Sequence, residues 1–199
     1  MSGHDAVVGP VPGGRDPDDY DRLRRRVLWS MPTGLYVVGT RAGGGRNLMT
    51  ISWVTQVATS PKLVGIGVES GARTHALLEE GGVFALSLLP RSQRAIVRRF
   101  VKPVTESSVD DDTGVGTMQG EPVHAAATGA PILDVALSWL DCEVRHVLAL
   151  GSHSFFVGEV VDCGGSAGGS PDRSSSGPGG ADLDSSPLRM EDTRMNYGG

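Results

Sequence analysis

The sequence has few cysteines and no long apolar run, and these absences exclude several classes of protein. Cys142 and Cys163 are the only cysteines among 199 residues, too few for a metal cage or a disulfide framework. Free buried thiols are expected instead, and they indicate a reducing, cytoplasmic location. No apolar run approaches the length that spans a bilayer, and the N-terminus lacks the basic-then-apolar order of a secretory signal. We therefore expect no membrane partner.

Charge and motif content exclude further classes. The net charge is −5 and the basic residues gather only locally, so a nucleic-acid partner is not expected. The chain has no nucleotide P-loop and no Gly-x-Gly-x-x-Gly that opens a helix after a strand. None of its five histidines is spaced for zinc, and no nucleophile elbow presents a serine. Such a chain suits a bound organic cofactor that performs the difficult chemical step itself.

Composition divides the chain into one folded domain and three other segments. A chain of this length suffices for one well-buried domain, which we place at residues 16–163. Residues 1–15 are rich in Gly and Pro, which predicts a disordered lead. Residues 164–187 form a Gly/Ser/Pro tract and are predicted to be a flexible linker. Residues 188–199 have a more varied composition, which favours a tail that returns to the domain.

Local signals predict one helix near the start and then a series of strands. Asp16 suits an N-cap and Pro17 the first position of a helix that runs to about Ser30. Strands are predicted at 35–40, 47–61, 62–68, 83–89, 137–147 and 154–162, and further helices at 75–80 and 90–100. The segment 104–130 is predicted to be irregular. Because strands and helices do not alternate, the pattern favours an antiparallel barrel or sandwich.

One predicted strand carries more polar side chains than solvation alone requires. Residues 47–61 alternate polar and apolar side chains and end at Pro61, which predicts a single strand with one face toward the core. Small hydroxyls and amides on the other face can hydrogen-bond a flat heteroaromatic ring, and the glycines at 43–45 let backbone N–H groups approach. These side chains are Asn47, Thr50, Ser52 and Thr55. The alternative interpretation is an ordinary strand with polar outer positions.

The segment after the next strand has the features of an anion site. Thr74 is predicted to cap the helix at 75–80, and Arg73 places a guanidinium beside it. Exposed backbone N–H groups at a helix N-terminus, a hydroxyl and an adjacent guanidinium together favour a bound anion. An ordinary capped surface helix is the alternative.

Five segments resemble, in order and spacing, the flavin reductase-like FMN-binding split-barrel family. They are residues 31–40, 47–53, 129–133, 139–144 and 151–160. The resemblance covers roughly residues 20–163 and implies a mainly β fold, a six-stranded antiparallel Greek-key split barrel with short peripheral helices. It also implies a homodimer that binds FMN, or FAD, near the dimer interface. Two departures from the family are Ser60, where a proline pair is common, and the low-complexity tract at 164–187.

The resemblance also implies an activity. Family members pass a hydride from NADH or NADPH to flavin, and many hand the reduced flavin to a partner monooxygenase. We therefore expect an NAD(P)H-dependent flavin reductase. Two alternatives are a flavoprotein that holds FMN and exchanges electrons without efficient NAD(P)H oxidation, and a non-catalytic split-barrel binding module.

Most of the family's flavin contacts fall on one predicted strand of this sequence. The resemblance implies that backbone groups of this strand line the isoalloxazine, at Asn47, Met49, Thr50, Ile51 and Ser52. Trp53 is expected beneath or beside the ring. The phosphate is assigned to Ser70, Arg73 and Thr74.

The remaining candidate residues lie in the second half of the chain. His153 resembles the histidine that the family uses in nicotinamide binding or hydride-transfer geometry, where no proton relay is required. A plain turn residue is the alternative there. Arg194 and Tyr197 resemble an Arg-x-x-Tyr ending whose tail crosses the flavin or the partner subunit, with a frayed terminus as the alternative.

Overall fold

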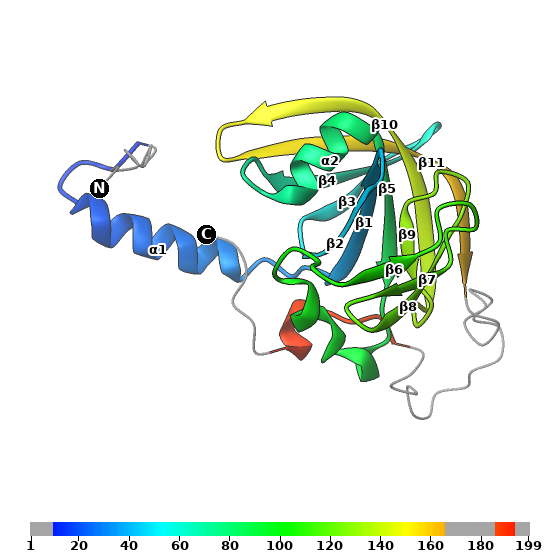
Figure 1. Ribbon diagram of the computed structural model, residues 1–199. Helices are drawn as coiled ribbons and strands as arrows, with labels where there is room; N and C mark the ends of the chain where they lie inside the picture. Colours follow the sequence, from blue (N-terminus) through cyan, green and yellow to red (C-terminus); the bar gives the residue numbers. More distant parts are fainter. Residues whose placement is uncertain (1–9, 166–185, 194–199) are drawn as a thin grey trace. The chain divides into compact units, whose positions relative to one another are not determined.

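The fold is known for residues 10–165 and 186–193, which the computed structural model describes (Figure 1). The chain divides into two units, one of residues 1–32 with 194–199 and one of Thr33–Thr193. Residues 1–9, most of the predicted linker, and the positions of Arg194 and Tyr197 lie outside the described residues.

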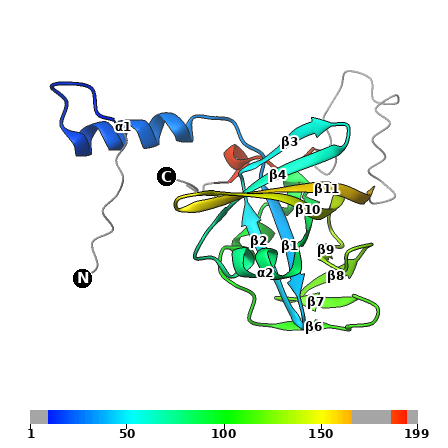
Figure 2. The ribbon, with the colours of Figure 1, turned by 90° about the horizontal axis from the view of Figure 1, so that it is seen from above.

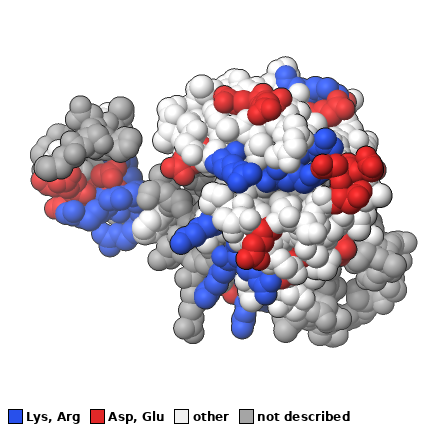
Figure 3. Space-filling view, in the orientation of Figure 1, with Lys and Arg blue, Asp and Glu red and all other residues white. Residues whose placement is uncertain are grey.

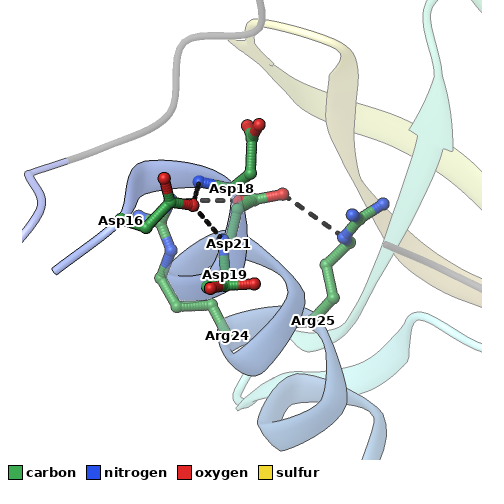
Figure 4. A network of polar contacts seen from close by, with 6 residues as sticks. All are labelled: Asp16, Asp18, Asp19, Asp21, Arg24 and Arg25. Atoms are coloured by element: carbon green, nitrogen blue, oxygen red, sulfur yellow. Dashed lines mark hydrogen bonds and ion pairs between the residues drawn. The ribbon is translucent and has the colours of Figure 1, made fainter.

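The first unit contains a helix that its own N-terminal residues define. Helix α1 spans Pro17–Trp29, and the Asp16 side chain accepts hydrogen bonds from the backbone N–H groups of Asp18 and Asp19 at 3.1 and 3.0 Å. Figure 4 shows this cap, and beside it the helix-surface ion pairs that Asp21 makes. The predicted cap and helix start are confirmed, because both depend only on neighbouring residues.

The second unit is built on a seven-stranded antiparallel sheet with the order β2-β1-β5-β10-β11-β4-β3. The strands are β1 (Tyr36–Ala42), β2 (Gly45–Ile51), β3 (Val54–Thr59), β4 (Lys62–Glu69), β5 (Val83–Leu88), β10 (Ser138–Leu150) and β11 (His153–Gly165). The two edge strands, β2 and β3, are consecutive in the chain and only Ser52 and Trp53 join them. The sheet must therefore curl until its edges meet, which makes a barrel (Figures 1 and 2).

We call the junction of β2 and β3 at Ser52 and Trp53 the seam. Among the described strands no pairing joins β2 to β3, so a covalent link closes the barrel there. The Val54 N–H donates to the Ser52 carbonyl at 3.1 Å, and the Gly67 N–H donates to the Trp53 carbonyl at 2.9 Å. These bonds turn the backbone out of β2 and into β3, which pairs with β4. A single strand over 47–61 was therefore the wrong prediction.

The mainly β, antiparallel fold class is confirmed, but the strand count is higher than six. The break at the seam adds a strand, and a second sheet of four short strands begins in the segment 104–130, which was predicted to be irregular. They are β6 (Ser107–Val109), β7 (Gly116–Met118), β8 (Glu121–Ala125) and β9 (Pro131–Leu133), in that order. The Leu133 N–H donates to the Ser87 hydroxyl at 3.0 Å and so fixes this sheet to the barrel. Strands this short produce no alternation that a sequence can reveal.

The helices of the second unit differ from their predicted bounds. Helix α2 spans Arg73–Gly81 with Ala72 at its N-cap and Gly82 in the left-handed region (φ 64°) at its C-cap. The predicted Thr74 cap is wrong, because the Thr74 hydroxyl faces inward. The predicted helix over 90–100 is two 3₁₀ helices, η1 (Arg91–Gln93) and η2 (Ile96–Phe100), and a third, η4, spans Met190–Asp192. Of the described helices, none is long and apolar enough to cross a membrane.

The two cysteines lie in different surroundings. Cys142 is buried in the core with Phe84 and Phe156, as predicted, and burial raises the pKa of its thiol to about 12. Cys163 is exposed, so the prediction of buried packing is wrong for it. The reason is that β11 continues beyond Glu159, the last residue that pairs with β4.

Residues 186–193 run along one end of the barrel. The Leu188 side chain is buried, its N–H donates to the Leu89 carbonyl at 2.9 Å, and its carbonyl accepts from the Leu35 N–H at 3.2 Å. Asp192 forms an ion pair with Arg91. This part of the chain therefore bridges the start of β1 and the end of β5.

Candidate active site

Two aromatic rings from distant parts of the chain meet at the seam. Trp53 lies in the link between β2 and β3, and His153 is the first residue of β11. Their ring centroids are 4.6 Å apart and their planes are inclined by 41°. Trp53 is 44% exposed, so its indole presents an open aromatic surface beside the imidazole. Such a surface can stack on a planar ligand.

Gly67 in β4 allows the indole to lie close to the sheet. A Cβ at this position would be 3.0 Å from Cε3 of Trp53 and 3.3 Å from its Cβ, closer than such atoms normally approach. A glycine inside a strand often marks a place where another group approaches the backbone closely. The group that approaches Gly67 is the Trp53 side chain, so this glycine positions the seam.

The imidazole of His153 is held on one side and open on another. Its Nδ1 lies 2.9 Å from the Ser152 hydroxyl, and its ring packs on Trp53. The next residue, Ser154, is buried with its hydroxyl 2.8 Å from Nε2 of His75 on α2, which fixes the start of β11. Within the described part of the chain, Nε2 of His153 makes no hydrogen bond, so it can bind a ligand.

The backbone of β2 offers polar groups beside the seam. As an edge strand, β2 directs about half of its N–H and C=O groups away from β1. Ile51 and Ser52 are buried and Met49 is half-buried at the end that meets Trp53. These residues therefore place backbone donors and acceptors next to the exposed indole.

Two polar side chains of β2 have a structural role. The Asn47 amide donates to the Thr74 hydroxyl at 2.9 Å, and its Oδ1 accepts the Val104 N–H at 2.9 Å. The Thr50 hydroxyl donates to the Val97 carbonyl at 2.6 Å. Both side chains are buried, so they join β2 to α2, to residue 104 and to η2. A ligand at β2 can use the backbone of these two residues, while their side chains are engaged within the protein.

The three residues assigned to the phosphate lie in different environments. Thr74 is buried, and its hydroxyl accepts from Asn47. Ser70 is exposed, and its hydroxyl donates to the Gly151 carbonyl at 3.3 Å, in the turn before His153. Arg73 is also exposed, and its guanidinium reaches the Val104 carbonyl at 3.5 Å. Arg73 also lines a hollow in the surface.

This hollow lies at the other end of β2 from the seam. It has a volume of about 340 Å³, and its walls come from the β1–β2 turn, the start of α2 and the segment before β6. It is lined by Gly44, Gly45, Arg46, Arg73, Val104, Thr105 and Ser107. Sequence reasoning missed Arg46. The available signal was the run of three glycines before it, which makes Arg46 the first long side chain after the turn.

The seam suits a planar heteroaromatic cofactor. It combines an exposed indole, an imidazole with a free ring nitrogen and an edge of polar backbone, which fit the faces and the rim of a flavin ring. Among the described residues, no group of three or more His, Cys, Asp or Glu side chains is placed to hold a metal ion.

Comparison with known proteins gives a consistent result. The model of the flavin reductase like domain matches residues 28–179. An NADH-dependent FAD reductase of Streptomyces globisporus is 34% identical over 155 residues, which cover 78% of this chain and 81% of that protein. An NADPH-flavin oxidoreductase of Streptomyces viridifaciens is 30% identical over 155 residues, which cover 75% of this chain and 76% of that protein.

A solved structure supports the same assignment. The styrene monooxygenase flavin reductase (SMOB) of Pseudomonas putida S12 superposes with a TM-score of 0.60 at 28% identity, covering 71% of this chain and 87% of that one. These findings confirm the predicted family and the predicted enzyme class, a flavin reductase. The chain belongs to the flavin reductase like domain family.

Proposed function

We propose that this chain uses NADH or NADPH to reduce FMN or FAD and supplies the reduced flavin to a partner monooxygenase. The observation that carries the proposal is the exposed Trp53 packed against His153, next to the free backbone edge of β2. The relatives support each part, since one is named an NADH-dependent FAD reductase, one an NADPH-flavin oxidoreductase, and one the flavin reductase of a styrene monooxygenase.

Each group at the seam has a role in this proposal. Backbone groups of residues 47–52 hold the rim of the flavin ring, and Trp53 covers the ring on one side and keeps water out. The Nε2 of His153 orients the carboxamide of the nicotinamide. When bound, flavin supplies the chemistry by accepting a hydride from the reduced nicotinamide. The protein contributes by holding the two rings together, and no side-chain proton transfer is needed.

Other predicted residues stay part of the proposal. Ser70 borders the turn before His153, and Arg73 stands at the hollow, so these two remain candidates for polar groups of the nucleotides. Thr74 contributes through its backbone and its bond to Asn47. Arg194 and Tyr197 stay predictions. A cytoplasmic location is supported by the two free cysteines.

An anaerobic stopped-flow experiment tests the activity. The purified protein is mixed with FMN or FAD, then with NADH or NADPH, and the visible absorbance of oxidised flavin is recorded. Rapid bleaching with at least one pair is expected, and it identifies the flavin and the donor. Tight flavin binding without bleaching would contradict the reductase and favour an electron carrier. Absence of flavin binding would leave only the binding-module alternative.

We further propose that the protein is a homodimer, as the resemblance predicts. After Val144 the β10 strand has only β11 as a neighbour among the described strands, and it continues past the barrel (Figure 1). Three apolar side chains on this free edge, Val147, Leu148 and Leu150, are 47–59% exposed. An unpaired edge strand with exposed apolar side chains is a typical protein interface.

Light scattering after size-exclusion chromatography tests this second proposal. The wild type is expected at twice the mass of one chain, and Leu148→Glu at a lower apparent mass, because a charge on this edge opposes its burial. A monomeric wild type would contradict the homodimer.

A further inference from the structure

We infer that the hollow between Arg46 and Arg73 binds a phosphate group of a nucleotide that this enzyme uses. The inference rests on the proposed function, because it assumes that a flavin nucleotide or a nicotinamide dinucleotide binds at the seam. It assigns to Arg46 a binding role that neither the sequence pattern nor the resemblance indicates.

The first observation is a buried charge with a free donor. The Arg46 side chain is only 8% exposed although it carries a permanent positive charge. Its Nε atom is buried and has no hydrogen-bond partner within the described part of the chain. A buried charged donor that lacks a partner is unfavourable, so an anion that enters the hollow and accepts this N–H is stabilised.

The second observation is that Arg46 already pairs with one carboxylate. Its Nη1 lies 2.6 Å from Oδ1 of Asp111, a carboxylate that is 75% exposed. Water and salt compete with Arg46 for an exposed carboxylate. A phosphate, which presents more oxygen atoms and a higher charge, can therefore replace Asp111 at Arg46.

The third observation is a second guanidinium at the same hollow. Arg73 lines it from the first residue of α2, and its only hydrogen bond among the described residues is the long one to the Val104 carbonyl. The guanidinium can therefore turn toward a ligand. The backbone N–H groups at the start of this nine-residue helix add positive potential. Figure 3 shows basic side chains in a band across the middle of the barrel, beside an acidic group.

The walls of the hollow are fixed in advance by Asn47. Its amide bonds Thr74 on α2 and its oxygen bonds Val104, so it sets the spacing between β2, α2 and the segment before β6. A site whose walls are already ordered binds a ligand without the free-energy cost of ordering them. Gly44 and Gly45 complete the rim, and without side chains they leave room for phosphate oxygens.

The spacing along β2 suits a flavin nucleotide. Arg46 precedes Ser52 at the seam by six residues, which corresponds to about 20 Å along a strand, and a flavin ring that reaches from the seam to Met49 leaves about 10 Å between its near edge and Arg46. The ribityl chain of FMN spans a comparable distance between the ring and its phosphate. The 2′-phosphate of NADPH offers the same chemistry, so the experiment must distinguish the two sources.

Equilibrium binding to Arg46→Gln tests the inference without requiring turnover. Riboflavin, FMN and FAD are titrated by flavin fluorescence, and NADH and NADPH by nucleotide fluorescence. If the flavin phosphate occupies the hollow, FMN is expected to bind about tenfold more weakly while riboflavin changes by less than about twofold. If NADPH alone weakens relative to NADH, the phosphate is that of the donor. Arg94→Gln, which removes an exposed arginine away from the hollow, is the matched control.

Asp111→Asn keeps the test decisive if Arg46→Gln folds poorly. It removes the competing carboxylate and is expected to tighten binding of the phosphorylated ligand about twofold to threefold, with riboflavin and NADH unchanged. Unchanged ratios of FMN to riboflavin and of NADPH to NADH in both variants would overturn the phosphate site. A wild type that binds FMN and riboflavin but bleaches neither would instead overturn the reductase and leave this site intact.

Discussion

The two ends of β2 differ in an instructive way. At the seam a large apolar side chain, Trp53, is 44% exposed, whereas at the hollow a charged side chain, Arg46, is 8% exposed. Folding alone favours the opposite arrangement, with the indole inside and the guanidinium in water. Both exceptions are explained if one ligand lies along the strand, with an aromatic ring at the seam and an anionic group at the hollow.

The middle of the same strand follows ordinary rules. Asn47 and Thr50 are buried, and each makes hydrogen bonds to the protein. Their polarity in the sequence therefore reflects tertiary connections and not a ligand-facing surface. The comparison shows that alternating polar residues can mark where a strand is attached to other elements.

The largest effect is expected for a substitution of Asn47, which connects β2 to α2 and to Val104. Asn47→Ala removes two buried hydrogen bonds and leaves the Val104 N–H without its partner. The free energy of unfolding is expected to fall by about 2–4 kcal/mol, measured by urea denaturation. Asn47→Asp keeps an acceptor for Val104 and should lose less. Full stability with a loss of flavin affinity would show instead that this side chain faces the ligand.

A smaller effect is expected at the seam. His153→Ala should raise the KM for the nicotinamide donor by about fivefold, because one oriented hydrogen bond and part of the stacking surface are lost. Flavin affinity should change little, since the flavin contacts lie on β2 and Trp53. Steady-state kinetics with the preferred donor, together with flavin titration, measure both quantities. A variant that loses flavin affinity alone would show that His153 contacts the flavin and not the nicotinamide donor.

Sequence reasoning succeeded where the determining residues are neighbours. Asp16 and Pro17 define the start of α1, and the strands predicted at 35–40, 137–147 and 154–162 are found as β1, β10 and β11. The break at the seam was missed because neither Ser52 nor Trp53 is a residue that ends strands. The four short strands between 104 and 133 were missed because three to five residues carry too little periodicity.

The candidate site shows the same division. The resemblance named Trp53 and His153, but only the pairing of β11 with β4 and of β4 with β3 brings them together. The three glycines before Arg46 mark a turn but not its burial, because that depends on residues 27 to 65 positions away, at Arg73, Val104 and Asp111. Distant contacts of this kind leave no local pattern.

The most direct test that flavin binds at the seam uses the fluorescence of Trp53. The chain has three tryptophans, and the variant Trp29→Phe with Trp139→Phe leaves only the one at the seam. Titration with FMN or FAD should quench its fluorescence strongly and at the same concentrations at which flavin binds, because the flavin ring lies against the indole. Flavin that binds without quenching this single tryptophan would contradict the assignment of the seam as the flavin site.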